Sequence, residues 1–233
     1  MELILVRHGE PAWEQEGRGR NDPDLTDRGH SQATAVARRL ADPDDPLSPG
    51  RVDRLLVSPA RRAVETAAPI AEALAMEAEA AQWLLEIQNP PEFEGSPIED
   101  IQEAYQAARL RSRQEAWAGL PGGEPVRDFH RRVTIGLRTW LFDHGVRPTD
   151  DPGLWDVDPS APDRVLAVAH AGTNSTIVAH LLDVVHQPWD WTRFAMGHAS
   201  AAVLTAVPLA GAHLWSLRAL GDSTHIPVAD RTY

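Results

Sequence analysis

Three short apolar runs, each followed by a stretch with helical features, constrain the fold of this chain most. The runs occupy residues 3–6, 54–57 and 165–169, and each has the length of a buried strand. The helices that follow are predicted to open after the N-cap Thr26 and to cover 60–76 and 173–182. This alternation predicts an α/β fold, a three-layer sandwich with a mainly parallel central sheet and helices on both faces.

The rest of the chain adds further strands and two irregular segments. Apolar runs at 201–207 and 214–220 are expected to complete the sheet, and a turn is expected at 42–50. Residues 87–124, with a helical stretch at 101–117, and residues 146–163 interrupt the alternation. We expect both to be lid insertions over the carboxyl edge of the sheet. The whole chain, 1–233, is expected to form a single domain.

Composition excludes several kinds of site. The chain has no cysteine, and its 22 basic residues are all arginine. Thiol nucleophiles, disulfides, cysteine-ligated metals, P-loop lysines and Schiff-base lysines are therefore impossible. The ten histidines show no HExxH or comparable spacing, so we expect no metal, and we expect no cofactor.

The net charge of −12 disfavours nucleic acid and anionic membrane as partners, because both need a basic face. The apolar run at 3–6 is bounded by Glu2 and Arg7, which makes it too short for a signal-peptide core or a membrane span. We therefore expect a cytoplasmic protein.

The chemistry is expected where the strands end, because ligands of open α/β sheets bind beyond the carboxyl ends of the strands. The first strand is followed by Arg7-His8-Gly9-Glu10, the second by Ser58 to Arg62, and the third by His170 to Thr173. Two histidines, at least two arginines and a helix N-terminus should therefore meet at one edge. Such a cluster suits a phosphate group.

The tetrapeptide at 7–10 resembles the RHG signature of the histidine phosphatase superfamily, which includes the phosphoglycerate mutases. Further blocks follow in the order of that family. Residues 25–33 resemble LTxxGxxQA, 58–67 resemble SPLxRAxxTA with Arg62 at its arginine, 85–95 resemble LxEI…WEG, 123–124 resemble the GES turn, 168–172 resemble VxSHGG, and 221–225 resemble NDxSH. The resemblance spans nearly the whole chain and implies a phosphoric monoester hydrolase of the phosphoglycerate mutase-like type.

The charges of the phosphate and of the arginines suggest a role for each residue at such a site. Arg7 and Arg62 are expected to neutralise the phosphate oxygens with planar guanidinium groups, although Arg61 is an alternative to Arg62. The same cations disfavour imidazolium, so His8 should stay neutral and act as the nucleophile. His170 is expected to stabilise the oxygens of the transferring group.

The general acid and the remaining phosphate contacts are expected from other segments. Glu86 is the expected acid, with Glu92 or Glu94 as alternatives because Pro90-Pro91 lengthens the segment between them. Asn21, from the loop after the signature, and Ala171, just before the third helix, are expected to contact the phosphate.

The expected function is therefore a phosphomonoesterase that acts on a small phosphorylated metabolite through a phosphohistidine. A cofactor-dependent phosphoglycerate-type mutase and a non-catalytic phospho-ligand binder are the alternatives. The expected partner is a small phosphorylated substrate, with no nucleic acid and no membrane, and a homodimer is left open.

Overall fold

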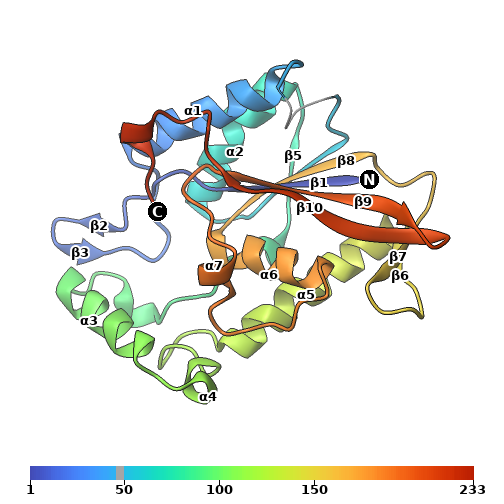
Figure 1. Ribbon diagram of the computed structural model, residues 1–233. Coiled ribbons are helices and arrows are strands. Elements are labelled where there is room, and N and C mark those ends of the chain that lie inside the picture. The colour runs from blue at the N-terminus through green and yellow to red at the C-terminus, as the bar shows by residue number, and fades with distance from the viewer. Residues whose placement is uncertain (46–49) are drawn as a thin grey trace.

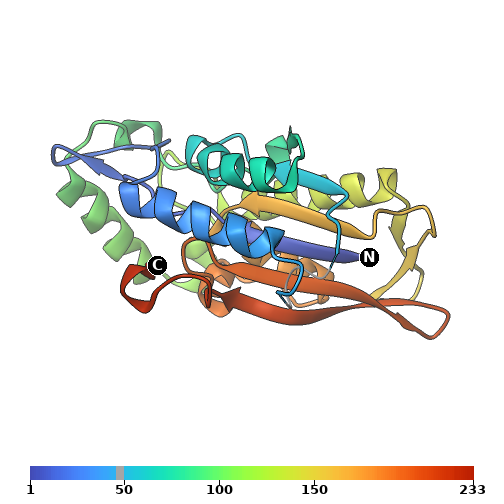
Figure 2. The same cartoon turned by 90° about the horizontal axis from the view of Figure 1, so that it is seen from above.

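A computed structural model describes residues 1–45 and 50–233 and places a sheet between two layers of helices (Figures 1 and 2). In these residues the main sheet has eight strands in the order β5-β4-β8-β1-β9-β10-β7-β6. Its strands are β1 (Glu2–Arg7), β4 (Arg54–Val57), β5 (Ala78–Ala80), β6 (Val146–Pro148), β7 (Leu154–Val157), β8 (Arg164–Ala169), β9 (Ala201–Leu209) and β10 (Ala212–Asp222).

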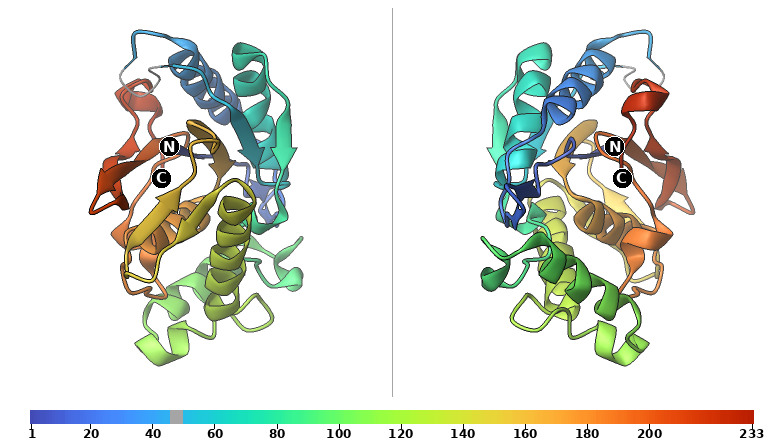
Figure 3. Two further views of the ribbon diagram at one scale, coloured as in Figure 1. Left: turned by 90° about the vertical axis from the view of Figure 1, so that its right-hand side faces the viewer. Right: turned by 90° about the vertical axis from the view of Figure 1, so that its left-hand side faces the viewer.

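The sheet separates two apolar cores, and Figure 3 shows the helices on its two sides. Alternate residues of β1 point to opposite faces: Ile4 and Val6 belong to one core, and Leu3 and Leu5 to the other. The helices α1 (Asp27–Ala41) and α2 (Arg61–Leu74) cover the first face, and α5 (Val126–Asp143) and α6 (Ala171–Leu181) cover the second. The predicted α/β fold with helices on both faces is confirmed.

The site lies on the parallel part of the sheet. Strands β5, β4, β8 and β1 pair in parallel, and the pairs from β1 onward to β9, β10, β7 and β6 are antiparallel. Val168 of β8 is in register with Val6 of β1 and with Val57 of β4. The carboxyl ends of these three strands are therefore level with one another.

The first predicted insertion is mostly helical. It contains α3 (Ile98–Arg109) and α4 (Arg113–Ala116), so the helical stretch expected at 101–117 is divided between two helices. The two helices are separate because Ser112 caps the start of α4. Ser112 and Glu115 form a reciprocal pair of side-chain to backbone hydrogen bonds there. A hairpin of β2 (Glu14–Gln15) and β3 (Arg18–Gly19) packs beside α3 on the same side of the molecule (Figure 1).

The second predicted insertion differs from its expectation. Residues 146–163 supply β6 and β7, which extend the sheet beyond β10 near the amino end of β1 rather than covering the carboxyl edge (Figure 1). Pairing of Leu154 and Trp155 with β10 buries the Trp155 side chain in the second core, which explains why this Pro- and Asp-rich segment is ordered as strands.

Of the remaining elements, the expected helices agree closely with the structure, whereas α5 was not expected. Thr26 caps α1 by accepting a hydrogen bond from the Gly29 backbone N–H across 3.0 Å. Helix α6 begins two residues earlier than predicted, directly after His170. Of the turn expected at 42–50, residues 46–49 lie outside the described residues. Among the described helices, none has both the length and the apolar character that a membrane crossing requires.

Candidate active site

Three polar side chains follow directly after the three parallel strands that are in register. His8 follows β1, Ser58 follows β4 and His170 follows β8. The backbone N–H of His8 donates to Ala169 O across 2.9 Å, and that of Ser58 donates to Val168 O across 2.9 Å. The sheet hydrogen bonding thus continues past the strand ends and brings His8 and His170 to a ring-centroid distance of 5.1 Å.

The His8 ring is buried and held in a defined orientation. Its Nδ1 lies 2.7 Å from Gly9 O, which fixes the proton on Nδ1 because a carbonyl oxygen only accepts. Its Nε2 then carries the lone pair and accepts from Arg62 Nε across 3.3 Å. Burial, together with the nearby His170, Arg62 and Arg7, holds the pKa of His8 well below its ordinary value. The imidazole is therefore neutral at neutral pH.

The two expected arginines converge on His8 from different elements. Arg7 ends β1, and Arg62 lies in the first turn of α2, where it is 5% exposed and its Cζ is 4.7 Å from the centroid of the Trp13 ring. Burial lowers the pKa of both, that of Arg7 to about 10, so both remain cations at neutral pH. Arg61 instead pairs with Asp24 across 2.8 Å in an exposed position, away from His8.

His170 is fully buried at the N-cap position of α6. Its Nε2 lies 2.7 Å from Ser58 Oγ, while its Nδ1 is buried without a hydrogen-bond partner. Burial holds the pKa of His170 well below its ordinary value, and the charges of Arg62 and Arg7 lower it further. When the Ser58 hydroxyl donates to Nε2, the proton of the neutral His170 ring is on Nδ1. This N–H is then free to donate a hydrogen bond to a phosphate oxygen.

Glu86 lies against the first turn of α6. Its Oε2 accepts from the Gly172 backbone N–H across 2.8 Å, and its Oε1 accepts from the Ile87 N–H across 3.0 Å. Burial raises the pKa of this carboxyl although Arg62 and Arg7 oppose the shift. A carboxyl with a raised pKa near two arginines and two histidines is suited to general acid catalysis.

The two alternative acids are placed differently. Glu94 is exposed, pairs with Arg20 across 2.9 Å and accepts from the Asn21 backbone N–H, and these contacts lower its pKa. Glu92 is exposed and its carboxylate lies next to Gly122. The geometry therefore favours Glu86 over both as the acid.

The two remaining phosphate-binding candidates come from different segments of the chain. Asn21 donates its side-chain N–H to Pro90 O across 3.1 Å, so part of its donor capacity holds the segment after Glu86. Ala171 is the first residue of α6, and its backbone N–H belongs to the four that have no acceptor within the helix. Because Glu86 occupies the Gly172 N–H, the amides of Ala171 and Thr173 are the ones left in that turn for an anion.

Comparison with known proteins agrees with this geometry. Residues 3–214 match the family model of the histidine phosphatase superfamily, branch 1. The chain belongs to this superfamily. Phosphoserine phosphatase 1 of Hydrogenobacter thermophilus is 34% identical over 136 residues, which are 57% of this chain and 61% of that protein. Glucosyl-3-phosphoglycerate phosphatase of Mycolicibacterium vanbaalenii is 28% identical over 85% of this chain and 81% of its own length.

Solved structures agree on the fold. A mycobacterial glucosyl-3-phosphoglycerate phosphatase in complex with inorganic phosphate superimposes with a TM-score of 0.70 at 24% identity, covering 97% of this chain and 99% of that one. The family match and the phosphatase-named relatives support a phosphoric monoester hydrolase, with the substrate not fixed.

A second set of residues in this histidine phosphatase holds the Arg7 side chain in place and was not predicted from the sequence. His198 Nε2 contacts an Arg7 guanidinium nitrogen at 2.8 Å, and its Nδ1 contacts Thr232 Oγ1 at 2.8 Å. Met196 O accepts from the same guanidinium across 2.7 Å. These residues come from the segment after α7 (Asp190–Arg193) and from the C-terminus, and no motif in the sequence marks them.

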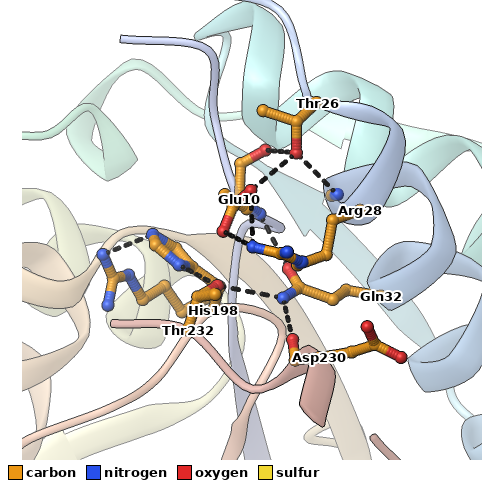
Figure 4. A network of polar contacts seen from close by, with 9 residues as sticks. Glu10, Thr26, Arg28, Gln32, His198, Asp230 and Thr232 are labelled. Carbon is orange, nitrogen blue, oxygen red and sulfur yellow. Dashed lines mark hydrogen bonds and ion pairs between the residues drawn. The ribbon is translucent and has the colours of Figure 1, made fainter. Parts of the chain in front are cut away.

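Figure 4 shows how the signature loop is joined to α1 and to the C-terminal segment. Gln32 Oε1 accepts from the Glu10 N–H across 2.8 Å, and Gln32 Nε2 donates to Asp230 O and Thr232 Oγ1. Arg28 pairs with the Glu10 carboxylate at 3.2 Å. This network joins the loop that carries His8 to the segment that carries His198.

Two glycines allow the signature loop to lie against α1. A Cβ on Gly9 would lie 2.5 Å from Gly29 O, and a Cβ on Gly29 would lie 2.2 Å from Glu10 O. Both contacts are with backbone atoms, so neither can be relieved by a side-chain rotation. The close approach explains the glycines in both the RHG-like and LTxxGxxQA-like blocks.

Proposed function

We propose that this histidine phosphatase hydrolyses a small phosphorylated metabolite through a phosphohistidine formed on His8. The observation that carries the proposal is the His8 ring itself. Its Nδ1 is committed to Gly9 O, its Nε2 faces Arg62, and the ring is neutral between two arginines and a second histidine. A binding protein would need the positive charge but no oriented, unprotonated imidazole nitrogen.

In the first step, the lone pair of His8 Nε2 attacks phosphorus and forms an N–P bond as the bond to the leaving oxygen breaks. Arg7, Arg62 and the His170 Nδ1–H offset the charge on the three peripheral oxygens. The Glu86 carboxylic acid gives its proton to the leaving oxygen, which departs as an alcohol. The raised pKa of Glu86 supports this role, because it increases the protonated fraction.

In the second step, a water oxygen attacks phosphorus and the N–P bond breaks, with its electron pair returning to His8 Nε2. The Glu86 carboxylate takes a proton from the water as it attacks. Inorganic phosphate is released, and both Glu86 and His8 return to their starting protonation states.

Small phosphorylated acids are the first substrates to test. The relatives described above are named for phosphoserine and for glucosyl-3-phosphoglycerate. A screen of such esters, with released phosphate as the readout, should identify the substrate class. Movement of the phosphoryl group on 3-phosphoglycerate with little free phosphate would instead select the mutase.

His8→Ala tests the mechanism. Wild-type enzyme mixed rapidly with ³²P-labelled substrate should carry label that survives alkali and is lost in acid, as expected of a phosphoramidate. The variant should bind phosphate, keep its fold and lose essentially all turnover and label. Label on a serine, or normal turnover by His8→Ala, would exclude the phosphohistidine. Cytoplasmic location and a homodimer stay predictions.

A further inference from the structure

A second histidine cluster lies outside the phosphate site. His130 is on α5, His186 is in the segment between α6 and α7, and Asp190 is the first residue of α7. One ligand atom from each of the three lies within 4.8 Å of the others. His130 is 5% exposed and Asp190 is fully buried, while the His186 side chain is 25% exposed. The reaction proposed above assigns no role to any of them.

Several polar atoms of this cluster are buried without partners. Neither ring nitrogen of His130 has a hydrogen-bond partner, and neither has Asp190 Oδ1. A buried polar group without a partner destabilises the folded state, and a charged one does so more strongly. Three such atoms in one place therefore point to a group that the protein chain itself does not supply.

The charge of Asp190 is only partly balanced by neighbouring residues. Its Oδ2 accepts from the Gln187 backbone N–H across 3.1 Å and contacts His186 Nδ1 at 3.1 Å. Arg193 is the positively charged side chain paired with its other oxygen, but the distance is 3.9 Å and the arginine is 41% exposed. A carboxylate in this position would gain from a nearby cation.

We propose that His130, His186 and Asp190 bind a divalent transition-metal ion of the Zn²⁺ type, with water as a fourth ligand. Two imidazole nitrogens and one carboxylate oxygen are a donor set that Zn²⁺ prefers. Zinc–ligand distances of about 2.0–2.2 Å place neighbouring ligands of a tetrahedral site roughly 3.3 Å apart. The hydrogen-bonded pair His186 Nδ1 and Asp190 Oδ2 already has this spacing, and no pair needs to close by more than about 1.5 Å.

The environment of His130 is compatible with metal binding. Burial, with a smaller effect of His186, lowers the pKa of His130 to about 4 although Asp190 opposes the shift. The ring is therefore neutral at neutral pH, as a metal ligand must be. His180 stacks on His186 with centroids 6.3 Å apart and also has a buried, unpartnered Nε2, but it is not one of the three residues that lie within 4.8 Å.

A bound ion would join two elements that support the phosphate site. The segment that begins with Asp190 continues to Met196 and His198, which hold Arg7. Helix α5 carries Arg132, which donates to Leu85 O and to Glu86 O. The ion would thus be structural, and it would fix the segment behind Arg7 against the helix behind Glu86.

This cluster departs from the expectation that the chain binds no metal. That expectation rested on the absence of closely spaced histidines along one helix. His130 and His186 come from different elements, and only the packing of α5 against the segment before α7 brings their rings to a centroid distance of 4.8 Å.

The test uses the untagged full chain, stripped with a chelator and then titrated with Zn²⁺. After gel filtration, elemental analysis should find close to one zinc per chain. The melting temperature should rise by roughly 5–10 °C when free Zn²⁺ is about 100 times Kd. Replacement by Co²⁺ should give the visible absorption of a tetrahedral site with histidine ligands.

Two variants at the proposed ligands and one control variant test whether zinc binds at this cluster. His130→Gln and Asp190→Asn should each weaken Zn²⁺ binding by about 100-fold or more, above the range for residues that only support ligands. Both should abolish the zinc-dependent rise in melting temperature. His30→Gln removes an exposed imidazole on α1 and should change neither. Circular dichroism and gel filtration check that each variant is folded.

The proposal is overturned if the wild-type chain retains no zinc after gel filtration. It is equally overturned if both folded variants bind zinc as the wild type does, because the metal would then lie elsewhere. The result is independent of the proposed phosphatase reaction, since metal content and melting temperature are measured without substrate.

Discussion

Glu86 Oε2 accepts a hydrogen bond from the Gly172 backbone N–H across 2.8 Å, and a Cβ on Gly172 would lie 2.5 Å from the other oxygen of the same carboxylate. The absence of a side chain at Gly172 is therefore what allows Glu86 to reach the first turn of α6. This relationship links a glycine of the VxSHGG-like block to the acid at the other side of the site.

Gly172→Ala should displace the Glu86 carboxylate and slow the hydrolysis of alkyl phosphates by about 10²-fold, the usual contribution of a general acid. Thermal stability should change little, because alanine has the higher helix propensity. Steady-state kinetics and a melting curve measure the two effects. Unchanged kcat in a folded variant would show that the contact does not position the acid.

Glu86→Gln should slow alkyl phosphates by about 10²-fold or more and aryl phosphates far less, because a phenolate departs without a proton. Loss of the base in the second step should also make the phosphohistidine accumulate. Glu94→Gln is the matched control and should show neither effect, since Glu94 pairs with Arg20 at the surface. The same leaving-group dependence in Glu94→Gln would move the acid to that residue.

Arg62→Lys should lower kcat/KM by about 10²-fold, because lysine keeps the charge but loses the planar guanidinium that contacts His8 and that we propose binds the phosphate oxygens. Arg61→Lys changes the adjacent exposed arginine in the same way and should have little effect. Similar losses of kcat/KM in both variants would indicate that Arg61 is also a phosphate ligand.

His198 should make folding stability depend on pH. Burial and Arg7 lower its pKa to about 3, whereas the unfolded chain has the ordinary value of about 6.5. The stability contribution is therefore present above pH 6.5 and is lost progressively as the pH falls toward 3. Well inside that range, one such histidine changes the free energy of unfolding by about 1.4 kcal/mol per pH unit.

His198→Gln should reduce the slope of unfolding free energy against pH by about that amount between pH 5.5 and pH 4. Urea denaturation at several pH values measures the slope. His30→Gln, which removes an exposed imidazole, is the control. An unaltered slope in His198→Gln would show that His198 is protonated in the folded state.

Much of the catalytic centre could be predicted from the sequence because it depends on strand ends. Apolar runs of strand length locate β1, β4 and β8, and parallel pairing brings the residues after them to the same edge. His8 and His170 were therefore expected to be neighbours without any knowledge of loop conformation. Arg62 was preferred to Arg61 only through the family resemblance, because the face of α2 that turns toward His8 depends on how the helix packs.

The sequence by itself determined the three parallel strands with the helices that follow them, the residues at the strand ends, and the exclusion of thiol and lysine chemistry. Only the tertiary structure decided which residues support those at the strand ends. The contacts of His198 with Arg7 and of His130 with His186 join segments far apart in the chain. Local periodicity carries no information about such contacts, because they depend on how helices and loops pack across the sheet. The strands within 146–163 have the same cause. Their hydrogen-bonding partner is the edge of β10, and the sequence of 146–163 does not indicate this pairing.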